Sequence, residues 1–143
     1  MEYLVHMSTS TDPNDRQVGG SHYRSKYQHW DLVITNHMFY LEAQATKYVT
    51  RWRRKNGVQD IEKSLHYLDK LESALQKGDF QYPPPREAVN LDLFAQENNI
   101  GDIEKTIFYL LMTYTDADGL VRTRVLLNHL LEMAKAEQEK TSA

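Results

Sequence analysis

Cysteine is absent from this chain of 143 residues, and its absence removes several kinds of chemistry. Without thiols the chain forms no disulfide bond, binds no metal through thiolates and has no cysteine nucleophile. Long hydrophobic runs are also missing, since no stretch approaches the ~20 apolar residues of a transmembrane helix. The opening residues, MEYLVHMSTS, lack the long apolar core of a secretion signal. We therefore expect a cytoplasmic protein without a membrane partner.

A large excess of charge of one sign is missing as well. The formal net charge is −3, from 17 basic and 20 acidic residues, and the isoelectric point is about 6.1. A protein with this balance has no general attraction for polyanions, so we do not expect nucleic acid as a partner. The length fits one compact domain, which can bury a core without disulfides or structural metals.

Glycine and proline are scarce, with six and four residues, and they mark the ends of segments. A polar stretch that runs into Gly19-Gly20 predicts a mobile N-terminal tail over residues 1–18. Three consecutive prolines, Pro83 to Pro85, cannot continue a helix and predict an extended connector. The connector separates a helical domain over 19–82 from C-terminal helices over 83–143, which pack on the same core or form the interface of an oligomer.

Apolar residues recur with a period of about 3.6 in most of the remaining sequence, and no run alternates as a strand does. The sequence therefore predicts an all-α protein, a compact bundle of about four to five helices around a helix-turn-helix core. Gly57 and Gly78 are expected to end two of these helices. The predicted helices cover about 37–55, 60–77, 87–98, 102–114 and 120–137.

One side of the first long helix carries an amide and several cations. At about 100° per residue, they form a stripe beside the apolar stripe of the same helix. Such a stripe can form a wall that binds phosphate. A solvated basic surface is the alternative interpretation, and the pattern leaves both open. The stripe consists of Gln44, Lys47, Arg51 and Lys55, with Arg54 at its edge, whereas Arg53 lies on the far side and is expected to face solvent.

The segment before this helix offers a second group of candidate residues. Gly19-Gly20 can let the backbone approach a phosphate, and His22 can transfer a proton or donate to a phosphate. A glycine pair that is merely flexible explains the same residues. Tyr23 and Trp30 lie outside the long periodic helices, so they are candidates for stacking on a base. The sequence contains neither a P-loop nor a dinucleotide-binding fingerprint.

A metal site is not indicated by the sequence. Glu62, His66 and Asp69 are spaced so that they share one helix face. Lys63 and Lys70 compete locally with a bound cation, and no established zinc motif surrounds these residues. We therefore assign no residue to a metal.

The chain contains a short internal repeat, which we call the echo. NGVQDIEKSLHYL, residues 56–68, resembles NNIGDIEKTIFYL, residues 98–110, and both contain Asp-Ile-Glu-Lys and Tyr-Leu. Two copies are too few for a solenoid, so the echo is either a duplicated helix start or a coincidence between amphipathic helices. Phe108 replaces His66 in the second copy, which is apolar on more of its sides. We expect the second copy to be more deeply buried, in the core or in a subunit interface.

Several of these features occur together in a known family. The segments GGSHYRSKYQHWDLV and LEAQATKYVTRWRRKNGVQDIEKSLHYLDKL resemble the SaV-like phage domain, a small domain encoded by many tailed bacteriophages. The resemblance covers about residues 19–75. Many members have Gly-Asn where this chain has Ala43-Gln44, a departure that keeps the amide. The matching residues are His22-Tyr23, Lys47-Tyr48, Arg51, Lys55, Gly57, Asp60, Lys63 and Tyr67-Leu68.

One branch of this family consists of nucleotide kinases without a P-loop. They phosphorylate deoxynucleoside monophosphates such as dTMP and dGMP and assemble into large oligomers. The stretch EAQATKYVTRW makes this chain most similar to that branch. The resemblance implies a kinase in the cytoplasm of the host cell, a nucleoside triphosphate as phosphate donor, and a homo-oligomer. Mg²⁺ is compatible with this chemistry, but the sequence assigns no ligand to it.

In this interpretation the catalytic residues are His22, Lys47 and Arg51. Lys47 and Arg51 hold the phosphates, and His22 closes over the substrate together with Tyr23 to exclude water. The expected substrate-binding residues are Tyr23, Trp30, Gln44, Arg54, Lys55, Asp60 and Lys63.

Asp60 is expected to cap the second helix and to orient Lys63 or Arg51, while Lys63 lies near the positive end of that helix. Two other functions stay open. One is a non-enzymatic phage module that binds nucleotides or a host protein. The other is an all-α nucleotide pyrophosphohydrolase, which needs paired acidic clusters on facing helices for Mg²⁺.

Overall fold

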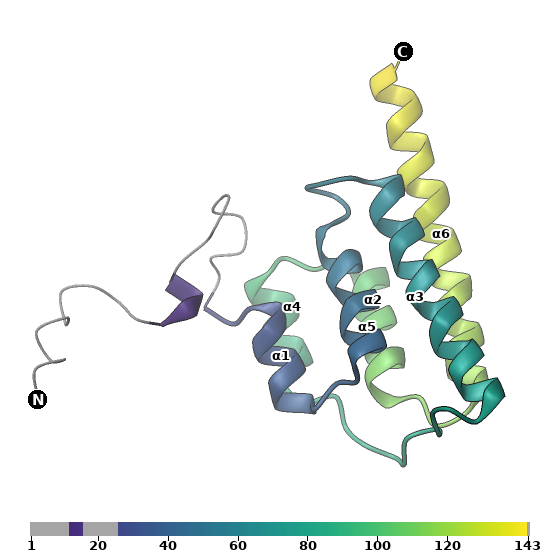
Figure 1. Cartoon of the computed structure of the whole chain (residues 1–143). Coiled ribbons are helices and arrows are strands. Elements are labelled where there is room, and N and C mark those ends of the chain that lie inside the picture. Colours follow the sequence, from purple (N-terminus) through teal and green to yellow (C-terminus); the bar gives the residue numbers. More distant parts are fainter. Residues whose placement is uncertain (1–11, 16–25, 143) are drawn as a thin grey trace, which may run out of the picture.

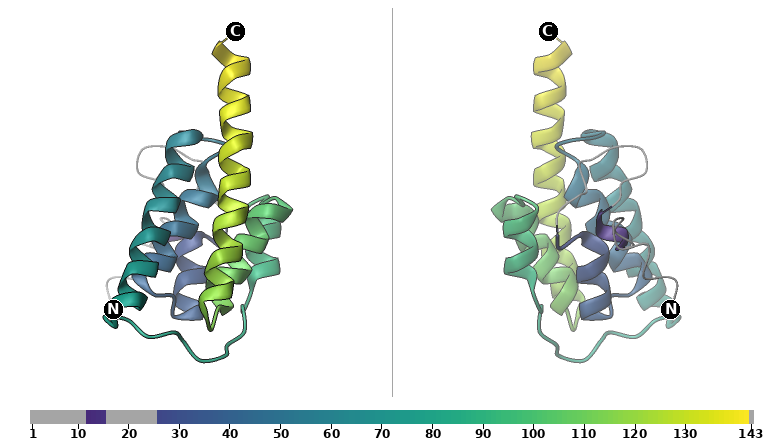
Figure 2. Two further views of the ribbon diagram at one scale, coloured as in Figure 1. Left: turned by 90° about the vertical axis from the view of Figure 1, so that its right-hand side faces the viewer. Right: turned by 90° about the vertical axis from the view of Figure 1, so that its left-hand side faces the viewer.

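The computed structural model describes residues 12–15 and 26–142. Over these residues the chain forms α-helices and a short 3-10 turn but no strand, so the predicted all-α class is confirmed. The helices lie in two layers, with α1, α2 and α3 on one side and α4, α5 and α6 on the other (Figure 1, Figure 2). The helices are α1 His29–Asn36, α2 Tyr40–Arg51, α3 Val58–Lys77, α4 Leu91–Glu97, α5 Asp102–Thr113 and α6 Ala117–Ser142.

The predicted helix over 37–55 is wrong at both ends. His37 takes a left-handed φ of 49° that closes α1, and α2 begins only at Tyr40. After Arg51 the chain runs through turns until Gly57, which has the expected positive φ, 49°. A glycine adopts this conformation without the strain that an L side chain would suffer. The predicted stripe of cations is therefore cut short at Arg51.

The helical hairpin of α2 and α3 forms the predicted helix-turn-helix core. α3 ends at Gly78, as the sequence predicts, with a left-handed φ of 78° and a bond from Gly78 N to Leu75 O of 3.2 Å. The two helices approach closely where their side chains are small. Ser64 Oγ donates to the carbonyl oxygen of Ala45 across 2.9 Å, and both residues are buried. This contact fixes the register of the two helices and thereby the side chains on their outer faces.

The C-terminal helices pack on the same core as α2 and α3. α4 is shorter than predicted, whereas α6 begins before the expected Leu120 and extends past the bundle (Figure 2). It begins early because Asp116 Oδ1 accepts the N–H of Asp118 at 3.0 Å, which caps the first turn. Within the described residues, no helix combines the length and the apolar character needed to cross a membrane.

α5 contains the second copy of the echo and is deeply buried, as the sequence predicts. Ile107, Phe108 and Leu111 are completely inaccessible to solvent. The other helices of the same chain cover these side chains. Their apolar surface therefore gives no support to a subunit interface on α5, because the core already explains it. The homo-oligomer stays a prediction from the resemblance.

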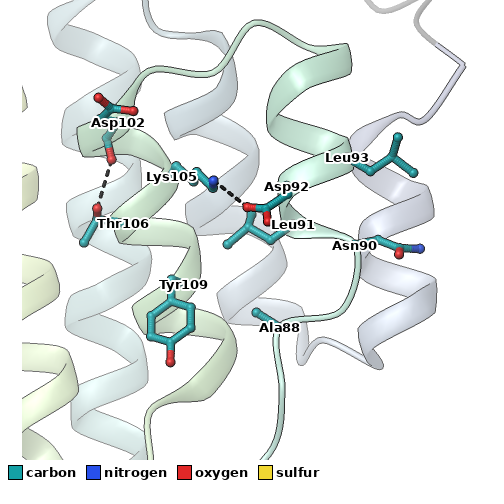
Figure 3. Close-up of a pocket in the computed structure, with 9 residues that line it drawn as sticks. All are labelled: Ala88, Asn90, Leu91, Asp92, Leu93, Asp102, Lys105, Thr106 and Tyr109. Carbon is teal, nitrogen blue, oxygen red and sulfur yellow. Dashed lines mark hydrogen bonds and ion pairs between the residues drawn. The ribbon is translucent and has the colours of Figure 1, made fainter.

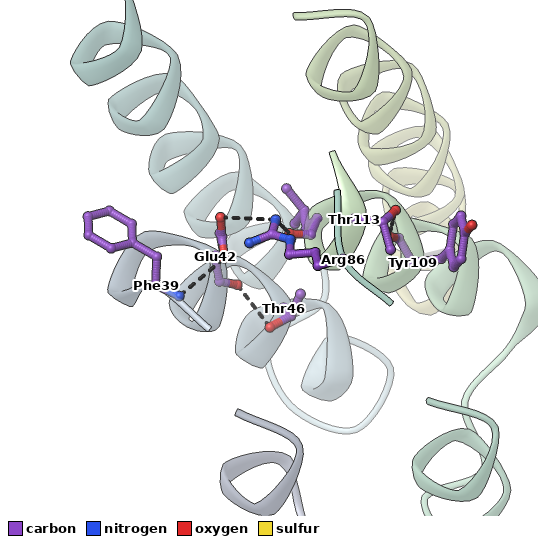
Figure 4. A network of polar contacts seen from close by, with 7 residues as sticks. Phe39, Glu42, Thr46, Arg86, Tyr109 and Thr113 are labelled. Carbon is purple, nitrogen blue, oxygen red and sulfur yellow. Dashed lines mark hydrogen bonds and ion pairs between the residues drawn. The ribbon is translucent and has the colours of Figure 1, made fainter. Parts of the chain in front are cut away.

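The connector before α4 is fastened to the core by Arg86 (Figure 4). Its Nη2 lies 3.6 Å from Oε2 of the fully buried Glu42 and donates to Leu111 O at 3.2 Å. The guanidinium also lies 5.1 Å from the centroid of the Tyr114 ring. Glu42 Oε1 accepts the backbone N–H of Phe39 at 3.1 Å, which caps α2. One buried carboxylate thus holds both the start of α2 and the connector.

The predicted mobile tail over 1–18 lies mostly outside the described residues. Its described part, Asp12 to Asp15, contains a short 3-10 turn, η2 Pro13–Asp15. Asn14 lies against the start of α1, since its Oδ1 accepts from Trp30 Nε1 at 2.5 Å and its carbonyl from Gln28 Nε2 at 2.8 Å. At Asn14, the tail is therefore attached to the folded body.

Candidate functional site

Cations surround the ring of Tyr48, where α2 packs against α3. The Nζ atoms of Lys47 and Lys63 lie 5.5 and 5.1 Å from the ring centroid, and the guanidinium carbon of Arg51 lies 5.4 Å away. A cation at such a distance is attracted to the ring by about 0.5–2 kcal/mol. We call Lys47, Arg51 and Lys63 the basic cluster. The structure thus brings together residues from two helices that the sequence predicted to bind phosphate.

A pocket opens beside the basic cluster, along the outer side of α3. Its volume of about 380 Å³ lies at the small end of the range for ligand pockets, roughly 300–1,000 Å³. The Tyr67 ring forms part of its wall and lies parallel to the Tyr48 ring, with centroids 6.0 Å apart and an interplanar angle of 11°. We call this hollow the α2–α3 pocket; it is lined by Tyr48, Gln59, Glu62, Lys63, His66 and Tyr67.

Asp60 lies completely buried beneath Arg51. Arg51 Nε is 3.5 Å from Asp60 Oδ2, and the same oxygen accepts the backbone N–H of Asn56 at 3.1 Å. Asp60 therefore holds the start of α3 and the arginine together. The pairing with Arg51 is as expected, whereas the N-cap of α3 is Gly57 and not Asp60. The Arg51 side chain is 19% exposed and forms no side-chain hydrogen bond with another described residue. Its Nε is buried against Asp60, so the terminal nitrogens of the guanidinium are the donors left to bind an anion.

Arg54 and Lys55 do not belong to the α2 stripe. Both follow the end of the helix, so the helical angle no longer places them beside Lys47. Arg54 Nη2 donates to the carbonyl oxygen of Asn98 at 3.0 Å, which directs it toward the turn before α5. Lys55 is exposed on the turn. Their predicted substrate-binding role loses its geometric basis, because tertiary contacts end the helix earlier than the sequence pattern does.

The remaining candidates lie apart from the basic cluster or beyond what is described. Gln44 is half-buried on α2, one turn before Lys47. Trp30 lies on α1, is 49% exposed and donates to Asn14. The predicted catalytic His22 and the predicted base-stacking Tyr23 lie outside the described residues.

Arg53 is exposed to solvent, as expected, but it also contacts α5 and the neighbouring tryptophan. Its Nε donates to Glu104 Oε2 at 2.8 Å, and its guanidinium carbon lies 4.5 Å from the centroid of the Trp52 ring. Trp52 Nε1 donates to the same carboxylate oxygen at 2.9 Å. The helical angle did not reveal these contacts, because Arg53 lies in the turn after α2, beside α5.

His29 is a half-buried group that the sequence pattern did not reveal. Its Nε2 lies 2.8 Å from Thr46 Oγ1, and its ring packs edge-on against Phe94 and Phe108, with centroids 6.2 and 6.0 Å apart. Burial lowers the pKa of His29 to about 4, with a further contribution from the charge of Lys47. His29 is therefore neutral at pH 7 and supports the inner side of α2.

Carboxylates are arranged differently from those of a magnesium-dependent pyrophosphohydrolase. Glu42, the acidic residue of α2, is buried against Arg86 and does not face the α2–α3 pocket. Glu62 lines that pocket, but in the described part of the chain no group of three His, Asp or Glu side chains converges as metal ligands would.

A larger hollow of about 750 Å³ lies between the connector, α4 and α5 (Figure 3). Lys105 Nζ pairs with Asp92 Oδ1 across it at 2.5 Å, and Tyr109 stands at its edge. Since Lys105 is already neutralised by Asp92, the hollow offers less attraction for a phosphate than the basic cluster does. None of the predicted site residues in the described part of the chain lines it.

Sequence reasoning missed Tyr67 and His66 as pocket residues. His66 was considered only as a metal ligand, and Tyr67 only as part of the family pattern. The spacing from Gln59 to Glu62, His66 and Tyr67 places these side chains along one side of α3, which a helical projection can show. That this side faces a pocket depends on Tyr48, which comes from the other helix of the hairpin.

Comparison with known proteins found no relative of this chain. No family model, no curated protein and no solved structure matches the chain. The similarity to the SaV-like phage domain therefore stays a prediction that depends on the residues quoted for it.

Proposed function

We propose that the protein is a nucleotide kinase that phosphorylates deoxynucleoside monophosphates of the dTMP and dGMP type without a P-loop. The observation that carries the proposal is the convergence of Lys47, Arg51 and Lys63 on the Tyr48 ring beside the α2–α3 pocket. The reaction itself comes from the resemblance to the SaV-like kinases. The phosphate donor in this proposal is a nucleoside triphosphate.

Phosphoryl transfer needs charge neutralisation and alignment more than covalent chemistry. The bond from the γ-phosphorus to its bridging oxygen breaks, and a bond forms to an oxygen of the acceptor monophosphate. Lys47 and Lys63 form no ion pair with a described residue, so their charges are free for these phosphates. Arg51 offers a planar pair of donors that fits phosphate oxygens, and Asp60 keeps it in place.

A second candidate function is nucleotide binding without transfer. One observation favours it: the α2–α3 pocket is small, about 380 Å³, whereas a kinase has to hold a donor and an acceptor together. The same basic cluster would serve a protein that binds nucleotides as a sensor or a sponge. In the kinase proposal, the donor has to be held by residues beyond this pocket.

Incubation with nucleotides and anion-exchange chromatography separates these functions. With dTMP, ATP and Mg²⁺, formation of dTDP and ADP supports the kinase, and the Lys47→Ala variant should then form far less dTDP. Unchanged nucleotides, together with measurable binding of dTMP, support the second function. Release of pyrophosphate from dTTP would instead identify a pyrophosphohydrolase and contradict the kinase proposal.

A further inference from the structure

The α2–α3 pocket has two ends of different chemical character. At one end the basic cluster surrounds Tyr48, with cations 5.1 to 5.5 Å from the ring centroid. At the other end Tyr67 lies one helical turn beyond Lys63 on α3, a rise of about 6 Å. Among the described residues, no cation lies over the Tyr67 ring, so positive charge is concentrated at the Tyr48 end.

Tyr67 is held as a fixed platform by the rings around it. Tyr48 lies parallel to it, and the ring of Tyr40 meets it at 78° with centroids 6.4 Å apart. His66 also lies beside it, at 68° and 6.4 Å. Aromatic side chains arranged in this way have few alternative positions, and a flat ligand ring gains stacking energy on such a surface without ordering it first.

A polar side chain lies beside this platform on the pocket side. His66 can donate or accept a hydrogen bond according to its tautomer, whereas Gln59 and Glu62 precede Lys63 on α3 and line the opposite end of the pocket. A nucleobase has a flat π face and a polar edge, which are the two features that this end of the pocket matches.

We propose that the α2–α3 pocket binds a nucleoside monophosphate with its phosphate at the basic cluster and its base stacked on Tyr67. This inference depends on the proposed nucleotide binding and adds the position of the base. It assigns to Tyr67 of α3 the stacking role that the sequence pattern predicted for Trp30 and Tyr23. Trp30 lies on α1, and its indole N–H is bonded to Asn14 rather than directed to this pocket.

The test compares three ligands by isothermal titration calorimetry: dTMP, 2-deoxyribose 5-phosphate and thymidine. The wild-type protein should bind dTMP about tenfold more tightly than 2-deoxyribose 5-phosphate, because only dTMP has a base to stack. Tyr67→Leu should bring these two affinities within about twofold of each other and leave the affinity for 2-deoxyribose 5-phosphate unchanged. Lys63→Ala should weaken both phosphates equally.

Two control variants distinguish a lost stacking contact from a disturbed fold. Tyr67→Phe keeps the ring and should retain the tenfold preference for dTMP. Tyr109→Leu removes an exposed tyrosine from the other hollow and should bind all ligands as the wild type does. If Tyr67→Leu keeps the wild-type preference for dTMP, the base does not stack on Tyr67, although nucleotide binding stands. If the wild-type protein binds no dTMP, the proposed function fails together with this inference.

Discussion

Arg53 Nε donates to Glu104 Oε2 across 2.8 Å, and this contact joins the turn after α2 to the first turn of α5. Glu104 is 3% exposed, and Trp52 Nε1 donates to the same oxygen. Gly101 lies so close to this carboxylate that an added Cβ would come within 2.7 Å of Glu104 Oε1. The basic segment after α2 is thus fixed at a buried acid that comes from the second copy of the echo.

The two copies of the echo bury different acids of the same Asp-Ile-Glu-Lys sequence. In the first copy Asp60 is buried and pairs with Arg51, while Glu62 is exposed at the pocket. In the second copy Glu104 is buried and Asp102 is exposed. The first arrangement places an arginine beside a pocket, whereas the second fastens a turn to the core.

Removal of Arg53 is therefore expected to lower stability. In Arg53→Ala, the buried Glu104 keeps Trp52 as a donor but loses its charged partner. The free energy of unfolding should fall by only about 1 kcal/mol, because Arg53 is 53% exposed. Glu104→Ala, which leaves the Trp52 donor unpaired as well, should cost about 2–3 kcal/mol. Urea denaturation measures both. Arg122→Ala, which breaks an exposed pair with Asp118, should change stability by less than about 0.5 kcal/mol.

Loss of a cation from the basic cluster should weaken nucleotide binding. Lys47→Ala and Arg51→Ala should each lower the affinity for dTMP, or the turnover, by about tenfold or more, because a charge-assisted hydrogen bond contributes about 1.5–3 kcal/mol. Arg122→Ala serves as the matched control for a lost charge, and circular dichroism verifies the fold. Full activity in both variants would mean that the basic cluster is only a solvated surface.

A charge at Phe108 should unfold the subunit rather than dissociate an oligomer. Phe108 is completely buried, and its ring packs against Phe94 of α4 and His29 of α1. Phe108→Glu therefore places an unpaired carboxylate in an apolar site. Circular dichroism should show a loss of helix. Tyr109→Glu, on the exposed side of the same helix, should stay folded. A folded Phe108→Glu protein with a smaller mass in light scattering would restore α5 as a subunit interface.

Acid should weaken the fold through His29. The pKa of His29 is about 4 in the folded protein and 6.5 in the unfolded chain, so the unfolded state binds more protons between these values. Stability should therefore fall as the pH drops from about 6.5 to 4, with a slope of at most about 1.4 kcal/mol per pH unit from this residue. Urea denaturation at pH 7 and pH 5 should show a smaller loss for His29→Gln than for the wild type. Equal losses would show that other groups cause the acid sensitivity.

Much of the helical framework follows from local sequence. The period of 3.6 in apolar residues predicted the all-α class, and Gly78 ends α3 where a left-handed residue was expected. The greater apolar character of the second echo predicted the burial of Phe108. Lys47 and Arg51 were placed on one side of α2 by the helical angle alone. These features depend on residues within a few turns of one another, which is the range over which a sequence pattern acts.

Tertiary structure decided where α2 ends and which charges stay free. Arg53 and Arg54 bind Glu104 and Asn98, which lie far away in the sequence, so the helical angle revealed neither contact. Likewise, Tyr67 becomes part of a pocket only because α3 packs beside Tyr48. A periodic pattern records which side of a helix is apolar, but the partner of a polar side chain depends on which element the fold brings next to it.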